Sequence, residues 1–281
     1  LGDVYKRQIL SNGLGIDFEY FIRETNDILF DIPINVLTGF TSQTSNAASM
    51  ENKGWELGLR YNKTFGDLKV QLSGQLSKVE NTVTDLNPKV DGGDLDRILY
   101  SSRILGEGFP FLGFYVLKTD GLITGSPDGP NAGMGAQAGD LNFIDSSGDG
   151  QINLDDREYV GKDIPTYTYG FQLGLQYKSF DLAAIFQGEA DVQYYGDFEL
   201  WRPDAGGVVT WKKWITESVT NNPSGTFPRA GSTTSSYRFV NDFFLYDRDW
   251  LRLKNLQIGY NIPTDSLPID GLRPVSYTHL R

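Results

Sequence analysis

The clearest pattern in this chain is an alternation of apolar and polar residues over positions 167–187. Side chains of a β-strand point to opposite faces in turn, so the pattern predicts a hairpin with one apolar and one polar face. Each arm has about ten residues, the length that a tilted strand needs to cross the hydrocarbon layer of a membrane. The apolar face carries Tyr167, Tyr169, Phe171, Leu173, Leu175 and Tyr177 in the first arm, and Phe180, Leu182, Ala184 and Phe186 in the second.

The alternation recurs elsewhere in the chain. Two segments are regular, at residues 53–63 and 68–78, and residues 13–25 follow the pattern with one exception. Residues 250–261 are less regular because Arg252 and Lys254 interrupt the apolar series, so their facing is left open. These segments predict further strands of the same design.

Short and long connections alternate between the predicted strands. Short turns lie near Phe65, Ser179 and Pro263, and the long connections are residues 26–50, 79–165 and 191–241. Bacterial outer-membrane barrels have short periplasmic turns and long extracellular loops. The sequence therefore predicts an all-β fold, a partial transmembrane antiparallel β-barrel with about six meandering strands of a larger barrel and long extracellular loops.

Both ends of the sequence are predicted to be translated sequencing adapter. Residues 3–8 can be encoded by GAT GTG TAT AAG AGA CAG, and the reverse complement of that DNA, read two bases in, encodes residues 275–279. Unrelated protein segments have no reason to be related in this way. Residues 1–8 and 275–281 are therefore excluded from the fold, residues 9–274 are assigned to the partial barrel, and the natural chain is expected to continue in both directions.

Composition narrows the possible functions. The only histidine, His279, lies in the excluded end, and the chain has no cysteine, which excludes thiol and imidazole catalysis, disulfides and zinc sites of ordinary type. The formal net charge of −11 argues against a nucleic-acid partner. Adjacent carboxylates on a strand point to opposite faces, whereas a glycosidase needs two of them across a sugar. No enzymatic activity is predicted.

Residues 145–156 match the spacing of a twelve-residue calcium loop. Such loops place oxygen ligands at positions 1, 3, 5, 7, 9 and 12 and a glycine at position 6, which is Gly150 here, and Ile152 is the apolar anchor at position 8. The alternative is a turn that orders itself through side-chain-to-backbone hydrogen bonds, and Ser147 in place of a stronger ligand weakens the calcium interpretation. The candidate ligands for Ca²⁺ are Asp145, Ser147, Asp149, Gln151, Asn153 and Asp156.

The second candidate site is an aromatic cluster in the connection of residues 191–241. Trp201, Trp211 and Trp214 are candidates for substrate binding, since exposed aromatic faces stack on sugar rings, and the alternative is packing against other loops or a partner protein. Together with the calcium loop, this cluster keeps another interpretation open: a soluble or surface calcium-dependent glycan-binding β-sandwich without catalysis. The two interpretations differ in the apolar face of the strands, which lies outward in a barrel and inward against a second sheet in a sandwich.

Several motifs resemble the SusC/RagA-like family of TonB-dependent outer-membrane transporters. They are ETNDIL at residues 24–29, SMENKGWEL at residues 49–57, the aspartate-rich stretch at residues 139–170, and YDRDWLRLKNL at residues 246–256. Their order along the chain is the order in which the family has them.

The resemblance implies a location in the cell outer membrane, in a barrel of about twenty-two strands with an N-terminal plug. It implies import of glycans or peptides together with a SusD-like lipoprotein lid, with energy delivered by TonB to a plug segment that this chain lacks. Contact with outer-membrane lipid follows from the barrel, and only about six strands near its C-terminal end are expected here.

Overall fold

The computed structural model describes residues 13–34, 36–86, 89–90, 93–94, 97–196, 216–219, 223–229, 239–262 and 272–278. The chain divides into two compact units, one of residues 1–91, 164–192 and 248–281 and the other of residues 92–163 and 193–247. Among the described residues, no helix is long and apolar enough to cross a membrane.

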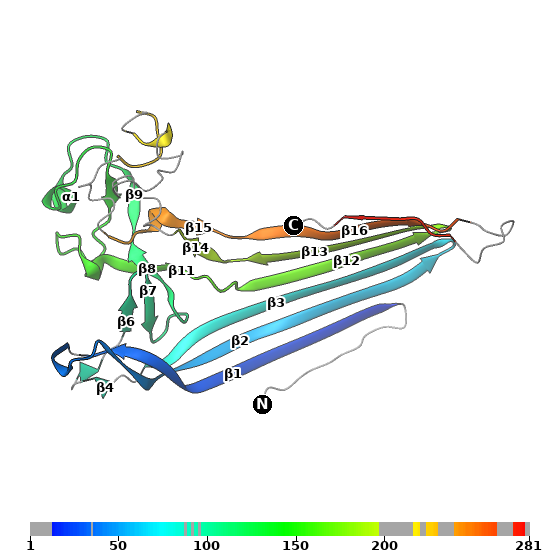
Figure 1. Cartoon of the computed structure of the whole chain (residues 1–281), viewed down its shortest axis with the longest axis horizontal. Helices are drawn as coiled ribbons and strands as arrows, with labels where there is room; N and C mark the ends of the chain where they lie inside the picture. Colours follow the sequence, from blue (N-terminus) through cyan, green and yellow to red (C-terminus); the bar gives the residue numbers. More distant parts are fainter. Residues whose placement is uncertain are drawn as a thin grey trace. The chain divides into compact units, whose positions relative to one another are not determined.

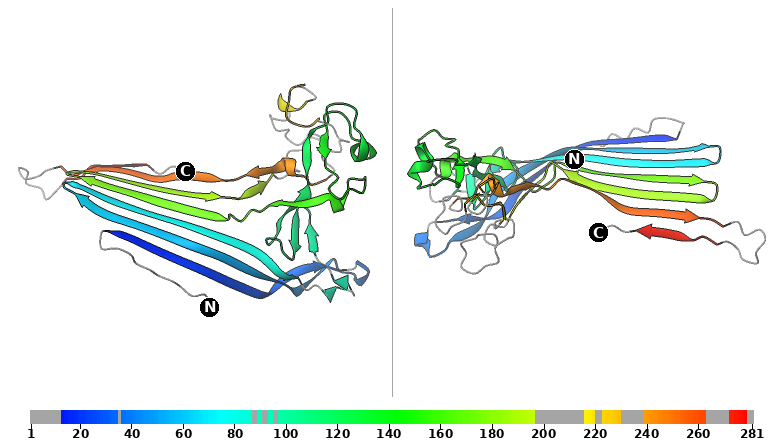
Figure 2. Two further views of the ribbon diagram at one scale, coloured as in Figure 1. Left: turned by 180° about the vertical axis from the view of Figure 1, so that it is seen from behind. Right: turned by 90° about the horizontal axis from the view of Figure 1, so that it is seen from above.

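The first unit is an antiparallel sheet of seven strands in the order β1-β2-β3-β12-β13-β16-β17 (Figures 1 and 2). Each strand pairs with its neighbour in chain order within the unit, as in a meander. Short 3-10 helix η1 (Val36–Thr38) follows β1, and two-residue β4 (Lys89–Val90) follows β3. The seven strands are β1 (Leu14–Pro33), β2 (Ser42–Phe65), β3 (Leu68–Leu86), β12 (Tyr167–Tyr177), β13 (Phe180–Ala190), β16 (Trp250–Tyr260) and β17 (Val275–Thr278).

The strand register gathers the apolar residues on one face of the sheet. Across its middle, one row of directly paired residues joins Tyr61, Leu72, Leu173, Ala184 and Leu256. Next to it, the rings of Phe171 and Phe186 stack with centroids 4.3 Å apart. Many side chains of this face are exposed, including Phe18, Leu59, Leu72 and Ile258. The predicted all-β fold, with one apolar and one polar face of the sheet, is confirmed. The sandwich interpretation requires a covered apolar face, which this sheet does not show in its described residues.

Aromatic residues line both ends of the apolar face. One row runs through Phe65, Leu68, Tyr177, Phe180 and Tyr260, and the other through Tyr20, Trp55, Lys78 and Tyr167. On β12 the rows are separated by the span from Tyr167 to Tyr177, about 34 Å at roughly 3.4 Å per residue. A tilt of about 45° reduces this to about 25 Å, the height of the apolar band of membrane barrels.

A β-bulge explains the irregular pattern of β16. Ile185 pairs with Asn255 and Phe186 pairs with Leu253, so Lys254 is the extra residue. Such an extra residue shifts the facing of a strand by one position. The apolar face therefore takes Leu251 and Leu253 before the bulge and Leu256, Ile258 and Tyr260 after it.

The loop predicted at residues 26–50 is largely strand. β1 and β2 remain paired up to Pro33 and Ser42, with register shifts near Ile28, and only residues 34–41 connect them. Likewise β3 continues to Leu86, into the predicted loop of residues 79–165. Beyond the apolar band neither face needs to be apolar, so the backbone ladder continues where the alternation has ended.

The excluded C-terminal segment takes part in the sheet. Val275–Thr278 forms β17, whose four residues are exposed and pair with Leu256 to Gly259 of β16. The unpaired edge of β16 offers N–H and C=O groups to any extended segment, so this pairing does not test the exclusion of residues 275–281 from the natural fold, which stays a prediction. Its predicted origin as adapter is untested by this pairing and stays a prediction; residues 1–8 lie outside the described residues.

The second unit contains short strands around a small core. Its four-stranded sheet has the order β11-β8-β7-β6, and two strand pairs accompany it, β9 with β10 and β14 with β15. Phe114, Ile104, Leu105 and Leu117 are fully buried. Its elements are β5 (Gly93–Asp94), β6 (Arg97–Tyr100), β7 (Arg103–Gly106), β8 (Gly113–Leu117), β9 (Thr119–Leu122), α1 (Gly129–Gly133), β10 (Leu141–Phe143), η2 (Leu154–Asp156), β11 (Arg157–Gly161), β14 (Gln193–Tyr195), η5 (Asp242–Phe244) and β15 (Leu245–Asp247).

An arginine at the middle of the apolar face tests the membrane-facing assignment. We expect Leu173→Arg to destabilise the whole folded protein in lipid vesicles by about 2–4 kcal/mol, because the charge would lie near the bilayer midplane. The matched change Gln172→Arg, on the polar face of the same strand, should cost much less. Denaturant unfolding in vesicles measures both, and equal losses would contradict the assignment.

Candidate functional site

The opposite face of the seven-stranded sheet is polar and solvent-exposed. The strand register brings five large polar side chains to this face: Arg60, Gln71, Gln75, Gln172 and Gln176. Arg60 pairs with Asp17 of β1 through a 2.6 Å contact between Nη2 and Oδ2. Because both side chains are largely exposed, this ion pair orients them but contributes little to stability.

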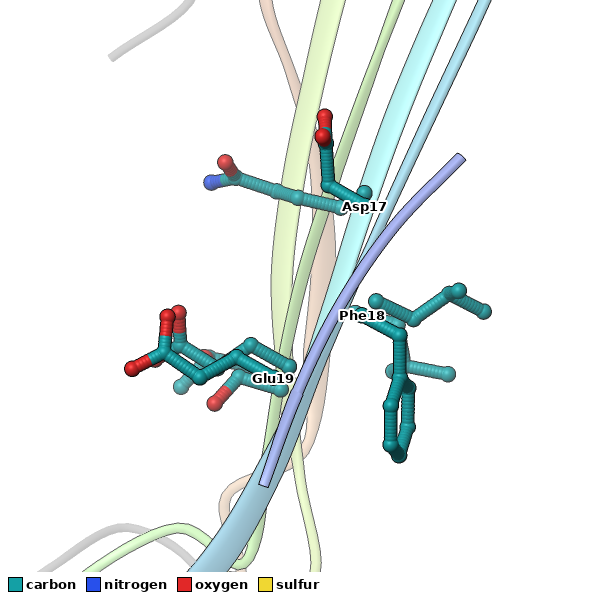
Figure 3. A pocket seen from close by; sticks show the side chains of 10 residues that line it. Asp17, Phe18 and Glu19 are labelled. Atoms are coloured by element: carbon teal, nitrogen blue, oxygen red, sulfur yellow. The ribbon is translucent and has the colours of Figure 1, made fainter. Parts of the chain in front are cut away.

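Acidic side chains concentrate at the β1 end of the polar face. Figure 3 shows Asp17 and Glu19 on one side of β1 and Phe18 on the other. Glu19 lies directly opposite Glu56, and the row continues through Ser77, Thr168 and Glu189. A shallow pocket there is lined by Asp17, Phe18, Glu19, Glu56, Leu57, Gly58, Gln75, Leu76, Ser77 and Thr168.

Sequence reasoning did not single out this acidic row. Its members lie on separate strands, and the pairing of Glu19 with Glu56 becomes visible only once the register of β1 and β2 is known. Carboxylates, hydroxyls and amides on one face can exchange hydrogen bonds with a polar solute or with another polar protein surface. The row therefore supports contact with such a solute or surface.

The aspartate-rich loop of residues 145–156 is held together by its own hydrogen bonds. Asp145 accepts from the backbone N–H groups of Gly148 at 2.7 Å and Gly150 at 2.8 Å. Asp149 accepts from the N–H of Gln151 at 2.8 Å and from the side-chain amide of Asn153 at 3.0 Å. The structure thus brings all six candidate ligands into one network, in which the Ser147 hydroxyl donates to Asp145 at 3.3 Å.

Two expectations for this loop are confirmed. Gly150 has φ of +83°, the left-handed conformation expected at the sharp turn. Ile152 is buried and packs in a core cluster with Leu117, Leu141 and Phe143. The apolar anchor therefore fixes the loop to the core of the second unit.

Asp156 is the most constrained of the candidate ligands. Its side chain is fully buried, and its two oxygens accept from the backbone N–H groups of Ser147 at 3.0 Å and Asn153 at 2.8 Å. Burial raises the pKa of this carboxyl, but the hydrogen bonds from Ser147 and Asn153 outweigh it and leave the pKa below its ordinary value. The ionised form is therefore the one that the fold stabilises.

These hydrogen bonds are those of a turn that orders itself. The same loop also gathers oxygen atoms of the kind that coordinate a cation. Among the described residues, no group of three or more His, Cys, Asp or Glu side chains is arranged to hold a metal ion. The carboxylates of Asp145, Asp149 and Asp156 already receive N–H donors. Calcium binding stays a prediction. Trp201, Trp211 and Trp214 lie outside the described residues, and their role in substrate binding stays a prediction as well.

Two curated proteins of Formosa agariphila resemble the chain along most of its length. TonB-dependent receptor P26 is 31% identical over 280 residues, which cover 92% of this chain and 27% of that protein. TonB-dependent receptor P3 is 29% identical over 279 residues, which cover 95% of this chain and 27% of that protein. The chain thus spans about a quarter of the length of the curated relatives it matches. No protein-family model matches the chain.

Solved structures share the fold. The RagAB peptide transporter matches with a TM-score of 0.71 and 22% identity, over 95% of this chain and 30% of that chain. The RagAB peptide importer in its closed-closed state matches with a TM-score of 0.71 and 23% identity, over 96% of this chain and 30% of that chain. At 22% and 23% identity, this similarity shows a shared fold and nothing further.

Removal of the charge at Asp156 tests the hydrogen-bonded loop. In Asp156→Asn, an amide group faces two N–H donors, so we expect a loss of about 1–3 kcal/mol of local stability. Hydrogen exchange of the Ser147 and Asn153 amides in the whole protein should become roughly ten-fold faster or more. Asp155→Asn, at an exposed neighbouring carboxylate, is the control and should leave both amides protected.

The same carboxyl predicts a pH dependence. Because the pKa of Asp156 is lowered in the folded protein, its stabilising contribution is fully present above the ordinary aspartate pKa of about 3.9. It is lost as the pH falls below that value toward the lowered pKa. Protection of the two amides, corrected for intrinsic exchange rates, should therefore fall below about pH 4 in the native loop. Acid-independent protection would contradict the assignment.

Proposed function

We propose that this protein is a transporter. The proposal starts from the family: the chain belongs to the TonB-dependent receptors, as its SusC/RagA-like motifs predict. On this proposal, the seven-stranded sheet is part of the wall of a transporter in the cell outer membrane. The whole protein, whose curated relatives this chain matches over about a quarter of their length, imports oligomeric nutrients through the barrel.

The observation that carries the proposal is the two-faced sheet. Its apolar face forms a band of about 25 Å between two aromatic rows, which fits a hydrocarbon layer. Its polar face presents exposed amide, hydroxyl and charged groups such as Gln75, Thr168 and Gln172, which fits a water-filled or plug-filled interior. A soluble binding module would need a cover for the apolar face.

The substrate class is an oligomer, a glycan or a peptide. Peptides are supported by the likeness of the fold to the RagAB peptide transporter. Glycans are supported by the tryptophans at positions 201, 211 and 214, whose rings would stack on sugars. The polar face adds hydrogen-bonding groups for either class, and we expect the imported oligomer to emerge uncleaved.

Two partners complete the proposal. The SusC/RagA-like motifs support a SusD-like surface lipoprotein as a lid over the extracellular end. The family name of the relatives supports energy input from TonB, which would act through a part of the protein outside this chain. Outer-membrane lipid surrounds the apolar face, and no nucleic acid is expected at a net charge of −11.

Deletion of the whole gene in its host tests the proposal. We expect the deletion to abolish uptake of either a fluorescently labelled peptide mixture or labelled oligosaccharides. The intact gene should restore that uptake, and depletion of TonB should abolish it again. Mass spectrometry of the imported material should show full-length oligomers. Unchanged uptake of both substrate classes, with the protein shown to be in the outer membrane, would contradict transport.

A further inference from the structure

The two aromatic rows of the apolar face differ in their neighbouring charges. At the row of Trp55 and Tyr167, two lysines have acidic partners: Lys53, next to the row, contacts Glu51 at 2.6 Å, and Lys78, in the row, contacts Glu80 at 2.7 Å. These short pairs neutralise the cations at the end of the sheet that carries the long connections. The opposite end carries the two-residue turns after β2 and β12.

At the turn end, two lysines lie over aromatic rings. The Nζ of Lys63 is 5.2 Å from the ring centroid of Phe65, and the Nζ of Lys178 is 5.4 Å from that of Tyr177. Phe65 and Tyr177 are each 51% exposed on the apolar face. Cation–π contacts at these distances hold an ammonium group at the level of the ring, and lysine side chains extend along apolar surface to place their charge in the interface.

These cations are poorly neutralised. Lys63 has no acidic partner among the described residues, and the carboxylate nearest to Lys178 is that of Asp67, at 3.9 Å with both side chains mostly exposed. A pair of this length and exposure contributes little. The turn end of the apolar face therefore keeps positive charge beside its aromatic row.

The two turns form one continuous rim. Leu68 of β3 pairs with Tyr177 of β12, and the N–H of Lys178 donates to the carbonyl oxygen of Asp67 at 3.5 Å. Phe65 pairs with Leu68 in turn, so one row of residues runs between the two lysine-capped rings. We call Lys63, Phe65, Tyr177 and Lys178 the turn rim.

We propose that the turn rim binds the phosphate of an anionic phospholipid in the periplasmic leaflet. The inference rests on the proposed function, because it requires the sheet to lie in the outer membrane with its short turns toward the periplasm. The aromatic rings lie at headgroup level, and the two ammonium groups are compact donors for a phosphate oxygen. The paired lysines at the other end offer no such excess charge.

Lipid-specific quenching at the rim tests this proposal in the whole protein. A bimane label on Ser179→Cys, between β12 and β13 and in a background without other cysteines, reports local lipid. The probes are brominated phosphatidylglycerol and brominated phosphatidylcholine in mixed vesicles. We expect preferential quenching by the anionic lipid, with a relative association constant that falls about five-fold for each lysine replaced in Lys63→Gln and Lys178→Gln, and falls further in salt.

Two lysines serve as matched controls. Lys69→Gln lies near the same turns on the polar face, and Lys53→Gln removes a neutralised lysine at the other end of the sheet. Both should keep the anionic preference. No preference in the native protein, or an equal loss in the control variants, would overturn the proposal. Heat-modifiable migration of the folded barrel reports insertion separately, so a failure of the membrane assignment itself is distinguishable from a failure of lipid selection.

Discussion

The need to pair every backbone N–H and C=O group shapes the first unit of this protein. In hydrocarbon an unpaired peptide group costs several kcal/mol (about 2–7 by transfer scales), so a segment that crosses a bilayer as strands must have continuous ladders. Between neighbouring strands from β1 to β16 the sheet meets this condition: the ladders run over the full apolar length, and the register shift that the described residues show at mid-band is the bulge at Lys254. A continuous ladder fixes the register, and the register determines which side chains meet lipid.

The two faces follow from that register. With side chains alternating, apolar residues are collected on one face and polar residues on the other. The polar face then holds groups that sequence distance separates, such as Asp17 with Arg60 and Glu19 with Glu56. Outside the apolar band, backbone groups are paired in another way. In the aspartate-rich loop, backbone N–H groups donate to the carboxylates of Asp145, Asp149 and Asp156 instead of to a neighbouring strand.

Much of the sheet could be predicted because a membrane-facing strand must be apolar at every second position. That requirement ends beyond the band, which is why the extension of β1 to Pro33 and of β2 back to Ser42 carried no readable signal. The facing of β16 was unreadable for another reason: the extra residue Lys254 is recognisable only against the partner strand β13. In the loop, Gly150 and Ile152 were predictable from local chemistry, whereas the acidic row was not, since it depends on cross-strand pairing.

The most direct test of the account is the accessibility of spin labels along β12 in the reconstituted whole protein. Labels at successive positions from Tyr167 to Tyr177 would be exposed to oxygen, which concentrates in lipid, and to a water-soluble nickel complex. A lipid-facing apolar face predicts a period of two, with Leu173 and Leu175 accessible to oxygen and Gln172 and Gly174 accessible to nickel. Uniform accessibility, or apolar positions shielded from both reagents, would contradict a lipid-facing wall.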